Sequence, residues 1–291
     1  MNLPSTTRRM ERRLGAWVRT RLPGWLGEFV MFVLKQGGAA LFGGVMLGAI
    51  ILTSAFWQDG WPLRRYDFLF LFALATQVTF LALKLETWAE ARVILLFHLT
   101  GTAMEIFKIA AGSWAYPEPG LIKLAGVPLF SGFMYASVGS YMARVIRIFE
   151  MRFAPYPPFW ATLLLACAIY INFFAHHYLP DIRLGLFAAT ILMFARTRIW
   201  YFIGDTPRWM SLPVAAFLAS IALWVAENVG TLTGTWVYTG QSQFQLVSFA
   251  KMGSWYLLLF VAFVTVTLVV RDPLSRTALS RSALSKARRL P

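Results

Sequence analysis

Two twelve-residue segments carry the same pattern of residue types that could do chemistry. Residues 105–116 read EIFKIAAGSWAY and residues 227–238 read ENVGTLTGTWVY. Each opens with a glutamate in apolar surroundings and has glycine seven residues later, followed by tryptophan at nine and tyrosine at eleven. The glutamates are Glu105 and Glu227, and the aromatic residues are Trp114, Tyr116, Trp236 and Tyr238. The repeated spacing predicts two sites of the same construction.

The two glutamates differ in one neighbour. A carboxyl group in an apolar helix is costly and marks a candidate functional position. Burial and the negative end of the helix dipole both disfavour its anion. Lys108, one turn beyond Glu105, is the available compensating charge, and Gly230 occupies its place in the second segment. We therefore expect Glu227 to be the better candidate for a carboxyl that keeps its proton at neutral pH.

Polar residues line one face of the helix that contains Glu105. His98, Thr102, Glu105 and Lys108 follow one another at steps of four, three and three residues. Such spacing places them on one side of a helix, so we expect a polar stripe that faces protein rather than lipid. The candidate catalytic residues are Glu105, Glu227, Lys108 and His98, and the four aromatic residues are expected to bind a substrate.

A third cluster, FFAHHYLPDIR at residues 173–183, supplies possible metal ligands. His176, His177 and Asp181 offer nitrogen and oxygen donors, which with the two glutamates could form a metal site. The alternative is that the histidines are ordinary residues of a membrane boundary. The sequence identifies no cofactor.

The composition is that of a membrane protein. Hydrophobic residues make up 58% of the chain and charged residues only 14%, far from the balance of soluble domains. The net charge of +14 could indicate nucleic-acid binding, but the arginines crowd both ends without interleaved aromatic residues, so we exclude it. The single cysteine, Cys167, excludes an intramolecular disulfide. Membrane lipids are the expected partners, and the oligomeric state stays open.

Eight apolar runs are expected to cross the membrane as helices, since a span needs about 20 such residues. Residues 22–36 precede them as a predicted interfacial helix. Small residues at every fourth position predict close helix packing at Ala40, Gly44 and Gly48 and again at Gly132, Ala136 and Ser140. The expected spans are 37–56, 66–83, 93–112, 128–148, 158–178, 182–195, 211–230 and 249–270, of which the sixth is short.

The distribution of Lys and Arg residues predicts which side of the membrane each loop faces. Eight spans place 21 of the 27 Lys and Arg residues on one side, which the positive-inside rule makes cytoplasmic, together with both termini. Residues 194–209 would lie there as an arginine-bearing loop. The third and seventh spans, which hold the two glutamates, then run in the same direction and end on the outer side. The prediction is an all-α polytopic protein of two parallel four-helix halves.

The chain divides accordingly into three parts. Residues 1–36 form a basic cytoplasmic arm and interfacial helix, and residues 37–270 form one transmembrane domain with halves at 37–150 and 151–270. Residues 271–291 form a basic tail, predicted to be flexible and attracted to acidic lipid headgroups.

Several stretches resemble a bacterial membrane family called domain of unknown function 817. They are HLTGTAMEIFKIAAGSWAYPEPG, GVPLFSGFMYASVGSY, AHHYLPDIR, ENVGTLTGTWVYTGQ and KMGSW, and the resemblance covers about residues 30–270. It implies a bacterial inner-membrane protein and no particular activity. Glu105, Gly112, Trp114, Tyr116 and the GVPL turn at 126–129 are also similar to membrane carotenoid cyclases and hydratases, which implies an isoprenoid substrate. The second half lacks the GVPL turn, and eight spans differ from the usual helix count of those enzymes.

Three functions remain open at this stage. An enzyme could protonate a lipid or isoprenoid double bond with a neutral carboxylic acid beside aromatic faces. A proton-coupled transporter could bind and release protons at the same carboxyls. In a non-catalytic membrane scaffold, each glutamate would hydrogen-bond a neighbouring helix or loop and fix the packing.

Overall fold

The computed structural model describes residues 13–18, 20–58, 60–242, 245–280 and 284. Residues 1–12 of the predicted basic arm and most of 281–291 of the predicted tail lie outside the described residues. The described chain is mainly helical. Its helices are α2 (Gly24–Ala39), α3 (Leu41–Phe56), α4 (Arg65–Ala82), α5 (Trp88–Ala110), α6 (Phe130–Ile148), α7 (Phe159–Ala175), α8 (Arg183–Phe194), α9 (Leu212–Leu232) and α10 (Phe249–Val269).

Each predicted apolar run coincides with a helix. The run at 66–83 corresponds to α4, and the run at 249–270 corresponds to α10. The short sixth run is the 12-residue α8. The expected interfacial helix is α2, which meets α3 at a bend of 70°. Long apolar stretches fold as helices because a helix satisfies all of its backbone polar groups internally.

Four helices, α4, α5, α9 and α10, are long and apolar enough to cross a bilayer, and the bent pair α2 and α3 makes a fifth if it forms one span. Helices α7 and α8 are apolar but shorter. At about 1.5 Å of rise per residue, α8 reaches roughly 18 Å, less than the ~30 Å hydrocarbon core. The chain therefore has the helices of a multi-pass membrane protein.

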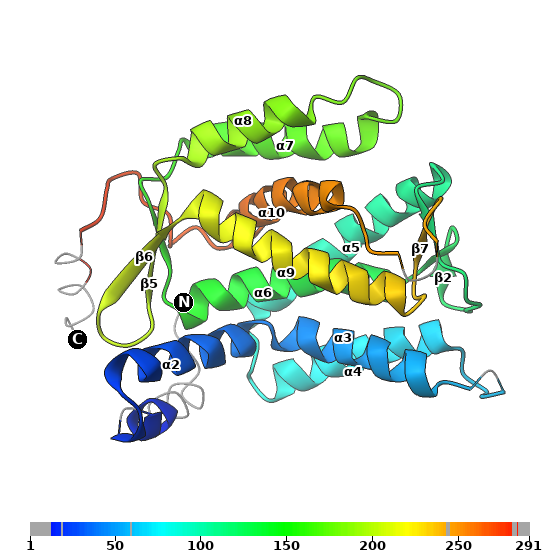
Figure 1. Cartoon of the computed structure of the whole chain (residues 1–291), viewed down its shortest axis with the longest axis horizontal. Coiled ribbons are helices and arrows are strands. Elements are labelled where there is room, and N and C mark those ends of the chain that lie inside the picture. The colour runs from blue at the N-terminus through cyan, green and yellow to red at the C-terminus, as the bar shows by residue number, and fades with distance from the viewer. Residues whose placement is uncertain (1–12, 19, 59, 243–244, 281–283, 285–291) are drawn as a thin grey trace.

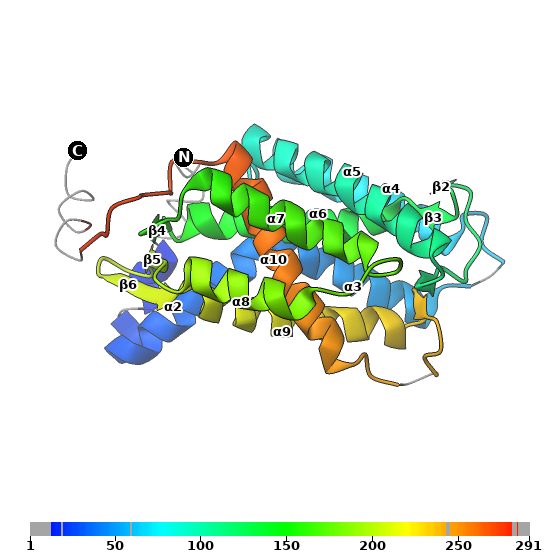
Figure 2. The same cartoon turned by 90° about the horizontal axis from the view of Figure 1, so that it is seen from above.

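Helices α3 to α10 run back and forth between two ends of an elongated molecule (Figure 1). We call these the β7 end and the β5 end, after the strands found there. Helix α6 packs against α2, α3, α4 and α5, whereas α10 packs against α5, α7, α8 and α9, and α6 and α10 also contact each other. Figure 2 shows the same bundle from above, with α10 crossing obliquely beneath α7. Residues of both α6 and α10 belong to the main hydrophobic core.

The prediction of an all-α fold is incomplete, because small antiparallel sheets lie at both ends. At the β7 end, β1 (Trp114–Ala115) pairs with β7 (Val237–Tyr238), and β2 (Lys123–Leu124) pairs with β3 (Val127–Pro128). At the β5 end, β4 (Arg152–Ala154), β5 (Arg198–Phe202) and β6 (Pro207–Ser211) form a three-stranded sheet. Two-residue strands carry no sequence periodicity from which they could have been predicted.

At the β5 end, the structure differs from two further expectations, one for residues 194–209 and one for the C-terminal tail. Residues 194–209, expected to be a loop, contain β5 and most of β6, which form a hairpin with Trp200 opposite Trp209. The tail was expected to be flexible, but its described part lies beside β4. Phe153 donates a backbone hydrogen bond to Pro273 and accepts one from Ser275.

The close packing predicted for α6 is confirmed at its contact with α5. A Cβ added to Gly132 would lie 2.4 Å from Thr102 Oγ1 and 2.5 Å from His98 Nδ1, so only glycine permits this approach. The corresponding prediction for the first span is wrong at Gly44 and Gly48. A Cβ at either glycine would meet no atom of the described residues within 4 Å.

Candidate functional site

Glu105, near the C-terminal end of α5, is held by the aromatic residues of its own segment. Its Oε2 accepts a hydrogen bond of 2.7 Å from Trp114 Nε1 and one of 3.0 Å from the Tyr116 hydroxyl. The other oxygen, Oε1, accepts a bond of 2.6 Å from the Tyr135 hydroxyl of α6. Glu105 is buried. Its carboxyl group is therefore surrounded by three donors that carry no positive charge.

Glu227, near the end of α9, has matching partners. Its Oε1 accepts hydrogen bonds of 2.9 Å from Trp236 Nε1 and 2.5 Å from the Tyr238 hydroxyl. Trp255 of α10 also interacts with this carboxyl group. In both segments, tryptophan nine residues on and tyrosine eleven residues on bond the glutamate that opens the segment.

The shared glycine explains how the chain turns back. Gly112 and Gly234 have φ values of +69° and +65° and follow the ends of α5 and α9 directly. The backbone N–H of Gly112 donates to Ile109 and that of Ser113 donates to Lys108, and the same two bonds recur after α9. This is the Schellman ending, which requires a left-handed residue. Glycine adopts that conformation without steric cost.

The two returning segments then pair with each other as β1 and β7. Trp114 lies opposite Tyr238 in this antiparallel pair. The Thr239 hydroxyl also bonds the Gly112 carbonyl at 2.5 Å. Side chains two residues apart in a strand share a face, so tryptophan and tyrosine of one segment point back toward the same glutamate. The C-terminal ends of α5 and α9 consequently lie together at the β7 end.

Both carboxyl groups line one cavity of about 340 Å³. All four predicted substrate-binding aromatic residues line it, as do Tyr135 of α6 and Trp255 of α10, whose rings are 6.2 Å apart. Among the residues the structure describes, neither glutamate forms an ion pair. The predicted Glu105 and Glu227 are thus brought to one place, in a mixed aromatic and polar enclosure.

Lys108 lines the cavity but does not compensate Glu105, contrary to the expectation from spacing. Its ammonium donates a 2.7 Å hydrogen bond to the Phe173 carbonyl and lies 2.9 Å from His177 Nε2. Burial and the neighbouring Lys108 lower the pKa of His177, so its ring is neutral at pH 7 and Nε2 can accept from the ammonium. Lys108 therefore ties α5 to the end of α7.

The predicted metal ligands do not converge. The Asp181 carboxylate accepts from Asn172 Nδ2 at 3.0 Å and forms an ion pair of 3.2 Å with Arg183. His176 Nδ1 lies against the Asn172 carbonyl, and His177 faces Lys108. No group of three His, Cys, Asp or Glu side chains in the described ranges is arranged to hold a metal ion. Ordinary hydrogen bonds and ion pairs occupy these residues instead.

His98 is not part of the cavity. It lies two turns before Glu105, against the α6 backbone at Gly132, with its ring 4.5 Å from that of Phe133. Its buried Nδ1 has no hydrogen-bond partner among the described residues. The polar stripe does face protein, since Thr102, Glu105 and Lys108 are all buried. The structure therefore does not bring His98 together with the two glutamates, because α6 covers this part of the stripe.

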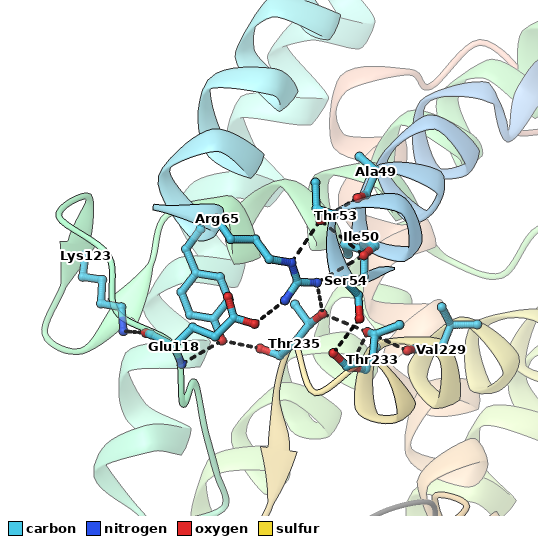
Figure 3. A network of polar contacts seen from close by, with 12 residues as sticks. Ala49, Ile50, Thr53, Ser54, Arg65, Glu118, Lys123, Val229, Thr233 and Thr235 are labelled. Atoms are coloured by element: carbon cyan, nitrogen blue, oxygen red, sulfur yellow. Dashed lines mark hydrogen bonds and ion pairs between the residues drawn. The ribbon is translucent and has the colours of Figure 1, made fainter. Parts of the chain in front are cut away.

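Arg65 was missed as a site residue, because by spacing it is simply an arginine beside a span. It is buried and joins three segments at the β7 end (Figure 3). Its guanidinium pairs with the Glu118 carboxylate of the loop after β1. It also donates to Thr53 Oγ1 of α3 at 3.0 Å and to Thr235 Oγ1 of the turn after α9 at 2.9 Å. Arg65 therefore fixes both returning segments against α3 and α4.

The two residues after Arg65 hold the same loops. The Tyr66 hydroxyl donates a 2.7 Å hydrogen bond to the Thr235 carbonyl. The Asp67 carboxylate accepts from the backbone N–H groups of Leu121 and Ile122 at 2.8–3.0 Å. The first turn of α4 thus positions the loop between β1 and β2 and the turn before β7.

A second buried polar cluster at the β5 end was also missed. Arg147 donates to both oxygens of Glu90, at 2.7 and 3.2 Å. Arg144 lies 3.6 Å from the Glu86 carboxylate, which also accepts from Ser140 Oγ at 2.7 Å. This network joins the start of α5 and the residues before it to α6 at the β5 end.

The fold and site define a polytopic helical membrane protein with a carboxylate and aromatic cavity at one end. The family described as Protein of unknown function (DUF817) matches residues 28–263, so the chain belongs to this family. It is 39% identical over 240 residues to the "Uncharacterized protein YoaT" of Bacillus subtilis (strain 168), covering 82% of this chain and 90% of that protein. No solved structure matches the chain.

Proposed function

We propose that the cavity at the β7 end binds a lipid or isoprenoid and carries out acid–base chemistry on it. The observation that supports this proposal is the placement of Glu105 and Glu227 in one cavity, each hydrogen-bonded by an indole and a phenol. A carboxyl group without a fixed cationic partner can exchange a proton with a bound ligand. The indole and phenol rings supply faces that stabilise a developing positive charge.

The two carboxyls are given different tasks in this proposal. Glu105 accepts from three side chains and both of its oxygens are engaged, so we assign it to positioning. The Trp236 and Tyr238 hydrogen bonds of Glu227 both reach Oε1, and Trp255 also interacts with this carboxyl group; we assign proton exchange to Glu227. Burial and the neighbouring glutamates raise the pKa values of Tyr116 and Tyr238 well above 10. These phenols remain protonated donors at neutral pH and keep each carboxyl in place.

We further propose that the site arose from two equivalent halves. The matching Glu, Gly, Trp and Tyr geometry supports this. In this proposal α3 to α10 all cross the membrane, residues 37–150 and 151–270 are the halves, and the cavity opens to the outer side. Both termini then lie in the cytoplasm of a bacterial cell, bounded by its inner membrane.

The test compares membrane lipid and pigment extracts from cells that carry the intact gene, Glu227→Gln, Glu105→Gln or no gene. Glutamine keeps the size of the side chain but cannot exchange a proton. We expect Glu227→Gln to reduce the product at least tenfold at an unchanged amount of membrane-inserted protein. An unchanged extract would rule out the acid–base role of Glu227. If both variants only lower the amount of folded protein, the glutamates serve packing alone.

A proton-coupled transporter is the second candidate function. The observation that favours it is that two acid groups without ion-pair partners among the described residues line a cavity at the β7 end, while the buried Arg147–Glu90 pair holds α5 and α6 together at the β5 end. Alternating access requires one end to be closed while the other is open. Uptake into vesicles that depends on a pH gradient and is lost with Glu227→Gln would favour transport over catalysis. The resemblance to carotenoid enzymes favours catalysis on an isoprenoid.

A further inference from the structure

The cavity carries more cations than its carboxyls engage. Lys108, Lys251 and Arg183 all line it. Neither lysine forms an ion pair among the described residues, and Arg183 pairs only with Asp181. Lys251 Nζ lies 3.8 Å from the centre of the Tyr238 ring, and the Glu227 hydrogen bonds come from indole and phenol donors instead.

This arrangement favours an anionic ligand group at the mouth of the cavity. The negative groups that line the cavity are Glu105 and Glu227, and the hydrogen bonds that hold them come from neutral indole and phenol donors. Attraction between charges is stronger where water is excluded. An anion next to Lys108 and Lys251 would find two ammonium groups and the Arg183 guanidinium within one enclosure.

An apolar groove adjoins the cavity. It has a volume of about 250 Å³ and lies between α5, α6, α7, α9 and α10. The residues that line both spaces are Tyr135, Val138, Leu223, Trp255 and Leu258. A second apolar groove, of about 340 Å³, shares no lining residue with the cavity. Only the first groove therefore continues the space in which the carboxyls lie.

Tyr135 marks the junction. Its hydroxyl bonds Glu105 at 2.6 Å, while its ring packs so closely on Gly101 that an added Cβ there would lie 2.6 Å away. Beyond this junction the groove reaches Cys167 and Tyr170 of α7. A ligand that spans both spaces would have a polar end at the lysines and an apolar end beside α7.

We propose that the substrate is a single-chain amphiphile with an anionic headgroup, whose head binds at Lys108, Lys251 and Arg183 and whose chain enters the groove toward Cys167. This inference rests on the proposed function and names the class of its substrate. Each space falls near or below the few hundred Å³ typical of a site for one small ligand. That size fits one hydrocarbon chain better than a phospholipid with two.

The test uses the full-length protein in nanodiscs of zwitterionic phosphatidylcholine and a dodecanoate probe with a photoreactive diazirine at the end of its chain. We expect crosslinks on the peptide that contains α7. Dodecyl phosphate should compete with the probe, while dodecylamine and dodecanol should compete at least tenfold more weakly. Equal competition by the amine would overturn the anionic headgroup.

Different variants test where the headgroup binds and where the chain binds. Lys251→Met and Lys108→Met should each weaken probe binding about tenfold, with Lys251→Arg retaining it and the exposed Arg92→Met as control. Cys167 is exposed where it lines the groove, so Cys167→Trp should block the groove and abolish crosslinking to α7. Leu164→Trp, at an exposed position of the same helix that does not line the groove, should not. Undiminished crosslinking in Cys167→Trp would overturn the groove assignment.

The acid–base role of Glu227 and the anionic ligand class can be refuted independently of each other. If Glu227→Gln leaves the lipid extract unchanged while the probe still binds selectively, the chemistry is refuted and the ligand class stands. If the extract depends on Glu227 but probe binding shows no preference for anions, the ligand class is refuted alone. Folding of every variant is checked by its thermal unfolding midpoint.

Discussion

At the scale of single residues, the position three residues after each glutamate separates two otherwise similar sites. In the second site it is Gly230, and the indole of Trp236 lies directly against it. In the first site it is Lys108, whose side chain extends to α7. Both residues allow the tryptophan to bond its glutamate, but only Lys108 adds a charge to the cavity wall.

Gly230→Ala tests the close contact in the second site. The new Cβ would lie 1.9 Å from the Trp236 ring, so the indole must move and lose its hydrogen bond to Glu227. Overpacking of this kind costs about 1–3 kcal/mol. We expect a lower thermal midpoint and altered tryptophan fluorescence. Gly48→Ala, where an added Cβ meets no described atom within 4 Å, is the matched control and should be neutral or slightly stabilising.

Lys108→Met tests the contact with His177. Burial and the Lys108 charge lower the pKa of His177, so acidification charges this imidazole only below its ordinary value near 6.5. Removing the ammonium should raise the His177 titration midpoint measured by NMR. The exposed Arg92 on the same helix gives the control, and Arg92→Met should leave the midpoint unchanged. An equal midpoint in wild type and Lys108→Met would contradict the contact.

At the scale of elements, the site is built by two helix ends that turn back and pair. The Schellman endings of α5 and α9 start β1 and β7, and the pairing of these strands brings Glu105 and Glu227 to one cavity. The first turn of α4 completes the arrangement. Arg65, Tyr66 and Asp67 contact both returning segments and fix them against α3.

Arg65→Met is expected to loosen this end of the protein. It removes the partner of Glu118 and leaves hydrogen-bond acceptors on α3 and near β7 unsatisfied. Loss of a hydrogen bond to a charged group costs about 1.5–3 kcal/mol. Limited proteolysis of the loop at 112–127 should become faster. Arg64→Met is the matched control, because Arg64 is the exposed neighbour of Arg65; equal proteolysis rates would argue against the clamp.

At the scale of the whole molecule, the two ends have different tasks. The β7 end holds the cavity with the two carboxyls. The β5 end has buried ion pairs around α6, a three-stranded sheet, the described part of the tail and the apolar groove of about 340 Å³. The carboxyls of the proposed chemistry therefore lie at one end of the molecule.

Arg147→Met should destabilise the entire bundle, because it leaves the fully buried Glu90 carboxylate unpaired. Breaking such a pair from one side typically costs about 3–5 kcal/mol. The double variant Arg147→Met with Glu90→Gln should recover part of this loss, since no charge is then left unpaired. Arg196→Met, an exposed arginine at the same end, should have little effect. The measurement is the yield and thermal midpoint in detergent.

The sequence by itself determined the helices and the two glutamate segments of the site. Long apolar runs can fold only as helices in a membrane, and the spacing of Glu, Gly, Trp and Tyr is local, so each residue was found from the chain alone. Only the tertiary structure decided which side chains of different helices and loops contact one another. In the structure, Lys108 contacts His177, His98 packs against α6, and Arg65 bonds loops that are far from it in the chain. Such contacts depend on helix packing and strand pairing, which no local pattern of residues encodes.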